Sequence, residues 1–274
     1  MSAESINDNV KDLIIPCWPT PPIIGSAVTT RFGGVSLPPY DSFNLATHVG
    51  DDPASVRLNR LSLVEQLGLP AEPAWLEQTH SVNVVHTDQT FESAAPLNAD
   101  ASIGTRRGDC GSHRNDNSIC VVLTADCLPI LLCDKAGEQI AAVHAGWRGL
   151  VNGIVDATIS SFQASPQQIM AWLGPAISQP YFEVGAEVKA QFENKNLHYQ
   201  AAFKPAARAE HWYADLYVLA KIQLQALGVT EIYGGGYCTY SDSTTQNEEQ
   251  ANRFYSYRRD RETGRIASLI WFKN

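Results

Sequence analysis

Two patterns of hydrophobic and polar positions recur along the chain, and each predicts a different kind of secondary structure. Short runs that are almost entirely apolar, such as residues 119–124 and 127–133, are typical of buried strands. Glycine, proline or polar residues bound each run. The strands predicted in this way cover residues 24–32, 74–86 with a break at 78–81, 119–124, 127–133, 139–144, 170–173, 231–239 and 266–272.

Three other stretches have the spacing of amphipathic helices. In residues 52–67 four apolar side chains fall on one face, and a glycine follows them. These residues are Val56, Leu63, Val64 and Leu67, followed by Gly68. Residues 147–159 repeat apolar side chains every three to four positions directly after a predicted strand, which predicts one helix there. The third predicted helix covers residues 214–227, with Gly228 as its C-cap.

The order of these elements indicates the fold class. Strands and helices alternate without a strict strand–helix–strand rhythm, which favours an α+β fold with a mixed sheet over a doubly wound one. Four prolines in residues 1–22 predict an extended N-terminal arm, and residues 104–118 are polar and rich in turn formers, as in a surface loop. No repeat or linker divides the chain, so we predict a single domain over residues 1–274.

Composition and charge exclude several classes of protein. With 274 residues and 44% hydrophobic side chains, the chain can bury a substantial core and is not disordered. Its formal charge of −9 disfavours general binding of nucleic acid. The most apolar stretch is interrupted by Thr124 and Asp126, so no membrane span is expected.

The N-terminal residues and the cysteines indicate a cellular location. The N-terminal residues are acidic and lack an apolar signal region, and the six cysteines form no CxxC pair. Both features favour a cytoplasmic protein with reduced thiols.

Three polar segments lie at the ends of predicted strands, and each carries a residue that can bind a metal. These residues are His80, Cys127 and His144. Because strand ends at one edge of a sheet converge, we expect the three side chains to meet. Two imidazoles and one thiolate suit Zn²⁺, and three protein ligands leave the fourth tetrahedral position open, as in catalytic zinc sites. Zinc lowers the pKa of a bound water from ~15.7 to about 7.

Taken singly, each of these residues has a simpler interpretation. A cysteine in an apolar strand usually belongs to the core, and a histidine at a strand end usually has a structural role. Asp126, directly before Cys127, weakens the core interpretation, because a buried acid needs partners. The spacing of the three residues alone leaves both interpretations open.

Two further segments suggest binding of an anion. The turn at 144–149 leads from a strand into a helix through a glycine, so that backbone N–H groups and Arg148 can bind phosphate or carboxylate. An ordinary solvated arginine is an equally good interpretation of Arg148. Residues 252–261 combine arginines with aromatic rings, which suits either a planar heterocycle beside an anion or a solvated strand edge.

Seven segments taken together resemble the YfiH-like laccase-domain family. They are TRFGG (30–34), FNLATHVGDD (43–52), QTHS (78–81), TADCLPILLCD (124–134), HAGWRG (144–149), LGPAIS (173–178) and YSYRRD (255–260). The resemblance extends over roughly residues 25–272. It implies a mixed β-sandwich flanked by helices, in four layers α/β/β/α. It also implies that His80, Cys127 and His144 bind zinc, with Cu²⁺ less favoured.

The same resemblance implies a function. Members of the family are described as multifunctional purine nucleoside phosphorylases, with phosphorolysis of adenosine, inosine and methylthioadenosine and with hydrolytic deamination of adenosine. The expected partners are purine nucleosides and phosphate, with no obligate protein partner. In the leading hypothesis phosphate binds near the metal and the helix start and attacks the anomeric carbon of the ribose. Motif membership and charge make Arg31, Asn44, Arg148 and Arg258 the candidate substrate contacts.

Other functions remain open at this point. Some bacterial relatives are described as peptidoglycan editing factors, so the second hypothesis is a Cys–His amide hydrolase with Cys127 as nucleophile and His144 as base, removing L-Ser from UDP-MurNAc-L-Ser. A copper polyphenol oxidase is less favoured, because the chain has only two methionines and seven histidines. A purely structural zinc site usually has four protein ligands. Two segments, 105–117 and 243–251, look longer than usual for the family, and either would change substrate preference if it folded over the site.

Overall fold

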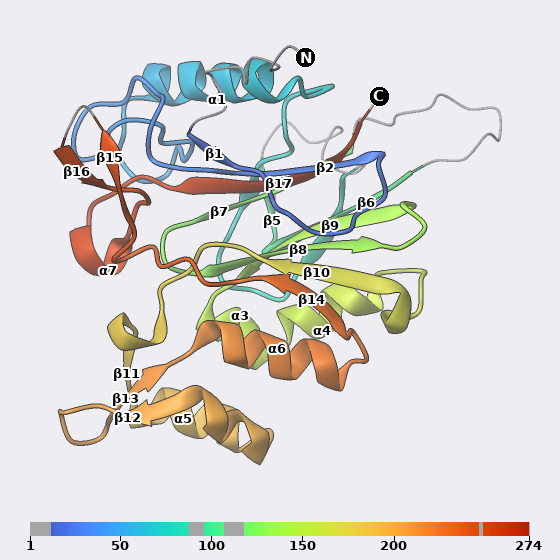
Figure 1. Ribbon diagram of the computed structural model, residues 1–274, viewed down its shortest axis with the longest axis vertical. Helices are drawn as coiled ribbons and strands as arrows, with labels where there is room; N and C mark the ends of the chain where they lie inside the picture. The colour runs from blue at the N-terminus through green and yellow to red at the C-terminus, as the bar shows by residue number, and fades with distance from the viewer. Residues whose placement is uncertain (1–11, 88–95, 107–117, 247–248, 274) are drawn as a thin grey trace, which may run out of the picture.

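The computed structural model describes residues 12–87, 96–106, 118–246 and 249–273, and these residues form four layers (Figure 1). Two β-sheets face each other in the middle. One helix covers the outer face of the first sheet, and a group of helices covers the outer face of the second. This is the α/β/β/α sandwich that the family resemblance implies.

The first sheet has four strands in the order β1-β2-β17-β7, and all neighbours are antiparallel. The strands are β1 Leu13–Ile14, β2 Ile24–Thr29, β7 Ile119–Thr124 and β17 Ile266–Phe272. Strands β2, β7 and β17 confirm predicted strands. The described part of the predicted N-terminal arm contributes β1, which pairs with β2 at the sheet edge.

The second sheet has six strands in the order β14-β10-β8-β9-β6-β4. The strands are β4 Val84–His86, β6 Ala101–Thr105, β8 Leu128–Asp134, β9 Gln139–Ala145, β10 Ile169–Leu173 and β14 Glu231–Gly234. The pairs β10–β14 and β4–β6 are parallel and the others antiparallel, so the sheet is mixed, as predicted. Strand β14 stops at Gly234 rather than at residue 239, because Gly234, Gly235 and Gly236 all have positive φ.

A continuous core fills the space between the two sheets. It is built from Val28, Cys120, Val122, Ile270 and Phe272 of the first sheet and Leu131, Cys133, Ile140, Ala142, Met170 and Trp172 of the second. Because successive side chains of a strand point to opposite faces, the alternate residues of the same strands face the helices. Both faces of each sheet are therefore buried, which explains why these strands appear in the sequence as continuous apolar runs.

Helix α1, Pro53–Leu67, covers the four-stranded sheet and confirms the first predicted helix. The Asp52 side chain accepts a hydrogen bond from the Ser55 backbone N–H at 3.0 Å and so caps the first turn. Gly68, with φ of 57°, ends the helix in the left-handed conformation.

The helices on the six-stranded sheet are α3 Trp147–Asn152, α4 Ile154–Ser160 and α6 Leu216–Ala226. Helix α6 confirms the predicted helix over residues 214–227. The single helix predicted over residues 147–159 is instead two short helices, because Gly153 adopts φ of 100° between them. The apolar spacing continues across this glycine, so periodicity alone did not reveal the break.

Several small elements were not predicted. Strands β11 Glu183–Gly185, β12 Phe203–Pro205 and β13 His211–Ala214 form a sheet beside helix α5 Ala186–Glu193. Such short strands give too few positions for a hydrophobic period to be visible. The remaining elements are β3 Leu76–Glu77, β5 Leu97–Asn98, β15 Ser243–Gln246, β16 Glu249–Asn252, α7 Tyr257–Asp260, η2 Pro166–Gln168, η3 Gln179–Tyr181 and η4 Leu197–Ala202.

Two predictions about the chain as a whole are affected by the extent of the described residues. Residues 107–117, most of the predicted surface loop, lie outside them, and so do residues 1–11 of the predicted arm. The first two residues of that predicted loop, Gly104 and Thr105, instead belong to strand β6. The single domain over residues 1–274 therefore stays a prediction. Among the helices of the described ranges, none has both the length and the apolar character needed to cross a bilayer.

Candidate metal centre and cavity

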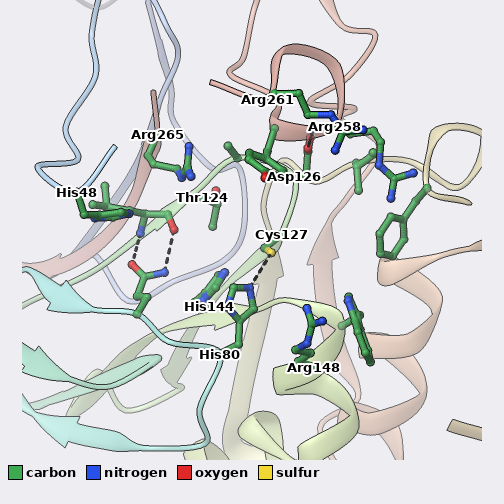
Figure 2. A pocket seen from close by; sticks show the side chains of 17 residues that line it. His48, His80, Thr124, Asp126, Cys127, His144, Arg148, Arg258, Arg261 and Arg265 are labelled. Atoms are coloured by element: carbon green, nitrogen blue, oxygen red, sulfur yellow. Dashed lines mark hydrogen bonds between the residues drawn. The ribbon is translucent and has the colours of Figure 1, made fainter. Parts of the chain in front are cut away.

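His80, Cys127 and His144 lie together at one end of the six-stranded sheet (Figure 2). His80 belongs to the segment between β3 and β4, Cys127 directly precedes β8, and His144 is near the end of β9. Their potential ligand atoms all lie within 4.8 Å of one another, and Cys127 Sγ is 3.8 Å from His80 Nε2. The convergence expected from the strand ends is therefore present in the structure.

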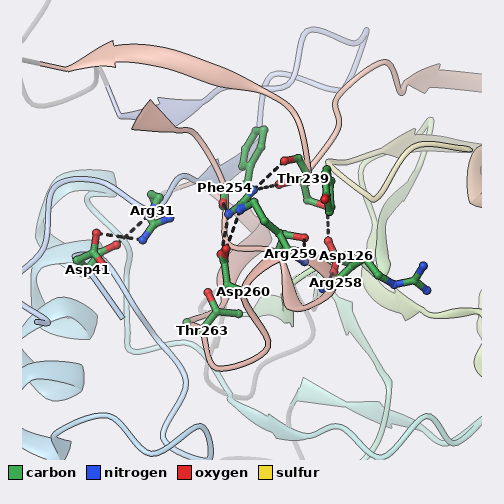
Figure 3. A network of polar contacts seen from close by, with 12 residues as sticks. Arg31, Asp41, Asp126, Thr239, Phe254, Arg258, Arg259, Asp260 and Thr263 are labelled. Carbon is green, nitrogen blue, oxygen red and sulfur yellow. Dashed lines mark hydrogen bonds and ion pairs between the residues drawn. The ribbon is translucent and has the colours of Figure 1, made fainter. Parts of the chain in front are cut away.

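The position of Cys127 depends on the crossing from β7 to β8, where the chain passes from one sheet to the other. Asp126 makes this turn with φ of 89°, a conformation that is unfavourable for a residue with a side chain. Its carboxylate accepts hydrogen bonds of 2.6 Å from the Thr239 hydroxyl and from the Arg258 backbone N–H (Figure 3). The acid before Cys127 is thus fully paired, and it connects the cysteine to helix α7.

Asp100 organises the two histidines. Its buried carboxylate accepts hydrogen bonds from the backbone N–H groups of Thr79, His80 and Ser81, and it lies 2.7 Å from His144 Nδ1. These contacts hold His80 in a left-handed conformation, with φ of 62°. An ionised carboxylate can only accept, so His144 Nδ1 carries a proton, and Nε2 is the ring nitrogen left for a metal ion.

Electrostatics at the centre favour the charged forms. Burial opposes ionisation of Asp100, but hydrogen bonds from His144 and Ser81 outweigh it and lower the pKa of the carboxyl to about 2. Burial also disfavours protonated His144, yet the charge of Cys127 and the bond to Asp100 raise its pKa to about 9. Burial by itself raises the pKa of the Cys127 thiol. The two histidines oppose this effect through their charge and their hydrogen bonds, and they lower the pKa to about 6.

Gly146 leaves the space in which the cysteine and His80 approach each other. A Cβ atom at this position lies 2.9 Å from Cys127 Sγ and 3.0 Å from His80 Cδ2, closer than packed side chains allow. The donor set, two imidazoles and a readily ionised thiolate, matches the ligands that Zn²⁺ and related divalent ions prefer. The residues therefore fit a metal ion with three protein ligands.

The three residues lie on the wall of a cavity of about 410 Å³. The complete lining is His48, Gln78, His80, Leu123, Thr124, Ala125, Asp126, Cys127, His144, Trp147, Arg148, Ile177, Phe182, Tyr257, Arg258, Arg261 and Arg265. Four of these side chains are arginines, whereas the one carboxylate, that of Asp126, has both oxygens hydrogen-bonded. The cavity is accordingly suited to an anionic ligand beside a flat apolar one.

Of the predicted substrate contacts, two reach the cavity. Arg148 is exposed at its rim, and its guanidinium lies 4.4 Å from the centre of the Trp147 ring. Arg258 also lines the cavity, but its guanidinium donates hydrogen bonds to the carbonyl oxygens of Tyr181 and Glu183. Arg258 therefore ties α7 to β11 and shapes the wall of the cavity.

The other two predicted contacts, Arg31 and Asn44, do not line the cavity. Their positions do not support direct contact with a substrate. Arg31 forms an ion pair with Asp41 at 3.0 Å and lines a separate surface hollow (Figure 3). Described residues of the hairpin β15–β16 line this same hollow, so they do not fold over the metal centre. Asn44 is fully buried, and its Oδ1 accepts from the backbone N–H of Arg265, which gives it a supporting role.

The prediction missed several residues that form the site. Asp100 could have been noticed as an acid inside an otherwise small and apolar segment, 99–103, since buried acids need partners. Arg261 belongs to the arginine-rich segment already singled out. His48 belongs to segment 43–52, which carries the family resemblance, but it was not singled out there. Arg265 carries no local signal, because the pairing of β17 with β7 brings it to the cavity.

The chain belongs to the YfiH-like laccase-domain family: the family model described as multi-copper polyphenol oxidoreductase laccase matches residues 25–273. It is 46% identical to "Purine nucleoside phosphorylase YfiH" of Shigella flexneri and 45% identical to the protein of the same name in Escherichia coli K12, in both cases over 94% of this chain and 98% of the relative. The crystal structure of Neisseria meningitidis protein NMB0706, 42% identical, superposes with a TM-score of 0.85 and covers 96% of this chain and 100% of that one.

Proposed function

We propose that the chain is a metal-dependent purine nucleoside phosphorylase. The observation that carries the proposal is one cavity that contains a three-residue metal-binding cluster, several arginines and exposed aromatic faces. The names of the Shigella and Escherichia relatives, which match over nearly their whole length, support the same reaction class.

His80, Cys127 and His144 would hold the metal, which we propose to be Zn²⁺. When bound with three protein ligands, such an ion has an open coordination position and supplies Lewis acidity to a ligand in the cavity. Asp100 orients His144 for this role by holding its Nδ1 proton. Loss of the thiol proton from Cys127 is favoured by the same histidines.

The nucleoside is proposed to lie with its purine against the apolar rings at one end of the cavity, where Trp147 and Phe182 supply flat faces. Arg148, stacked on Trp147, contacts the bound nucleoside from the rim. Arg258 holds the wall that carries Phe182, since its guanidinium is 5.4 Å from the centre of that ring.

The proposed reaction is the attack of a phosphate oxygen on the anomeric carbon of the ribose. The C–O bond forms as the C–N glycosidic bond breaks, and the electron pair of that bond goes to the purine. The proton of hydrogen phosphate ends on the departing purine nitrogen, so the products are ribose 1-phosphate and the free base. Positive charge that develops on the sugar in the transition state is stabilised by the phosphate dianion.

Adenosine, inosine and methylthioadenosine are the proposed substrates, and deamination of adenosine is a proposed second activity. The test incubates the purified metal-loaded protein with adenosine, with and without phosphate, and identifies the products by chromatography. Adenine that forms only with phosphate supports the phosphorylase, and inosine without phosphate supports the deaminase. If none of the three nucleosides releases its free base with phosphate, and adenosine is not converted to inosine, the proposal is wrong.

One observation favours a second candidate, a Cys–His amide hydrolase. Cys127, His144 and Asp100 are arranged in the order of a nucleophile, a base and a carboxylate that orients the base. Metal content separates the two functions. Metal-free protein that hydrolyses UDP-MurNAc-L-Ser, and loses this activity with iodoacetamide, supports the hydrolase; activity that requires the metal supports the phosphorylase.

The remaining expectations follow from the same proposal. Copper oxidation of polyphenols is disfavoured by the single three-residue cluster found in the described residues, because a multicopper oxidase needs several copper sites. We expect a cytoplasmic protein whose partners are nucleosides and phosphate, without nucleic acid, membrane or an obligate protein partner.

A further inference from the structure

The cavity has two chemically different ends, with the metal-binding cluster between them (Figure 2). One end carries Arg148, whose guanidinium lies 4.4 Å from the centre of the Trp147 ring, and Arg258, whose guanidinium lies 5.4 Å from the centre of the Phe182 ring. The opposite end carries His48, Thr124 and Arg265. These three side chains are polar and offer a purine no flat apolar face.

Thr124 is the first unusual feature of this end. It is only 1% exposed, and its hydroxyl oxygen has no hydrogen-bond partner among the described residues. Five buried side-chain oxygens in the described ranges share this property, and Thr124 Oγ1 is the one that belongs to the cavity lining. A buried hydroxyl without a partner is unfavourable unless a ligand or water supplies one.

Arg265 lies beside Thr124 because of the strand register. Ile266 of β17 pairs with Thr124 of β7, so the residue before Ile266 emerges at the same end of the sheet. Arg265 Nη1 donates to the carbonyl oxygens of Thr263 and Gly264, both at 2.9 Å, and this fixes the guanidinium. Nε and Nη2 have no partner among the described residues, and Arg265 forms no ion pair there.

This end presents the guanidinium donors of Arg265 and the hydroxyl of Thr124. The neighbouring side-chain amide of Gln78 is fully paired with the Leu123 backbone. Its Nε2 donates to the carbonyl oxygen and its Oε1 accepts from the N–H, each at 2.8 Å. The nearest acids contribute little. Asp126 has both carboxylate oxygens paired, and exposed Glu77 acts on His48 from outside the cavity lining. An anionic ligand whose oxygens accept hydrogen bonds, such as hydrogen phosphate, matches this arrangement.

We propose that Thr124, Arg265 and His48 form the phosphate subsite of the cavity. The proposal rests on the proposed function and divides the cavity into a purine end at Trp147 and Phe182 and a phosphate end at Thr124. The sequence led us to expect phosphate at the helix start beside Arg148. We place it at Thr124 instead, because α3 has only six residues before the break at Gly153, and such a short helix has a weak dipole.

The test compares Thr124→Val and Arg265→Lys with the wild-type protein in steady-state phosphorolysis. Removing one donor to a charged ligand is expected to raise the KM for phosphate about tenfold or more, while the KM for the nucleoside changes less than about twofold. Thr124→Ser, which keeps the hydroxyl, should restore the wild-type KM for phosphate. Ser268→Ala is the matched control, because it removes another unpartnered buried hydroxyl, in β17 and outside the cavity lining.

Calorimetric titration with inorganic phosphate alone makes the result independent of turnover. Weaker phosphate binding by both variants, with unchanged metal content, supports the subsite even if no nucleoside is cleaved; in that case only the proposed function is wrong. If the wild-type protein performs phosphorolysis and both variants keep its KM and its affinity for phosphate, the subsite is overturned. A rise in the KM for the nucleoside instead of phosphate would assign this end to the nucleoside and also overturn the proposal.

Discussion

Two buried polar clusters of this protein differ in how fully their hydrogen bonds are used. Beneath α1, Asn59 Nδ2 donates to Ser36 Oγ and to the carbonyl oxygens of Ser42 and Asn44, while its Oδ1 accepts from the Val35 N–H. Asn44 and Asp51 join the same network at 2.8 Å. Every polar atom of Asn59 is therefore occupied within the protein.

The centre at the end of β9 is different. Asp100 is fully paired, but the ligand atoms of His80, Cys127 and His144 face one another within 4.8 Å. Polar groups that satisfy one another stabilise a loop, whereas groups that are held rigidly with open lone pairs are prepared for a ligand. Burial of polar residues alone would not have separated the two clusters.

The largest expected effect is that of Cys127→Ala. Removal of one of three ligands should abolish stoichiometric metal binding and lower turnover by about 10³-fold or more. Metal content by plasma mass spectrometry and nucleoside cleavage measure the two effects. Cys133→Ala is the control, since Cys133 is a buried core residue between the sheets. Equal losses in both variants would contradict the assignment of Cys127 as a ligand.

Asn59→Ala should show the opposite behaviour. The substitution leaves several buried groups without partners, and we expect the free energy of unfolding in urea to fall by about 2–4 kcal/mol. Metal stoichiometry should stay unchanged, because Asn59 lies outside the centre. Asn194→Ala, at an exposed helix end, should change stability by less than about 0.5 kcal/mol. Loss of metal in Asn59→Ala would show that the two clusters are coupled.

Asp100→Asn preserves the shape of the carboxylate but removes its charge and one acceptor. The expected result is about 10–100-fold weaker metal binding, because the carboxylate orients His144 and increases its basicity. Competition with a chromogenic chelator measures the affinity. Unchanged affinity would mean that the contact between Asp100 and His144 is only structural.

Gly146→Ala tests the space inside the centre without changing any ligand. Its Cβ would meet Cys127 Sγ at 2.9 Å, so we expect metal affinity to fall by up to about tenfold as the ligands move apart. Gly149→Ala is the matched control three residues on, where the added Cβ meets the Ile154 side chain at 3.2 Å and the His144 backbone oxygen at 3.4 Å but none of the metal-binding atoms. Equal metal affinity in the two variants would show that the centre tolerates the added methyl group.

The smallest expected effect is in the pH dependence of stability. The pKa of Asp100 is lowered to about 2 in the folded chain, from 3.8. Its ionised form therefore stabilises the fold above about pH 4, and this contribution is lost as the pH falls through about 2. The difference in unfolding free energy between wild type and Asp100→Asn, both metal-free, should be largest near pH 5 and should shrink toward pH 2. A difference that does not change over this range would contradict the assigned pKa.

Local sequence predicted much of the fold but not its details. The strands that form the centres of both sheets were found because both of their faces are buried, and α1 was found because its cap and its glycine stop are encoded in neighbouring residues. The break at Gly153 and the sheet β11–β13 were missed. A glycine inside a regular apolar pattern can be helical or not, and strands of three or four residues show no period.

The candidate site was predicted to a similar extent. His80, Cys127 and His144 were identified because they occur where apolar strands end, and their convergence follows from the sheet. Arg31 and Asn44 belong to segments that carry the family resemblance, yet neither residue lines the cavity, so membership in such a segment does not by itself indicate a direct contact. Asp100 was missed although its position among small apolar residues indicated that it is buried.

The amino-acid order by itself determined the kinds of side chain available for chemistry and the strand ends at which they lie, because hydrophobic alternation and turn residues act over a few neighbouring positions. Folding then decided which distant residues share one cavity. Arg265 meets Thr124 only through the register of β17 on β7, and His144 meets Asp100 only through the pairing of β9 with β6. Such contacts depend on through-space packing and on which hydrogen bonds are left unused, and neither can be read from local spacing.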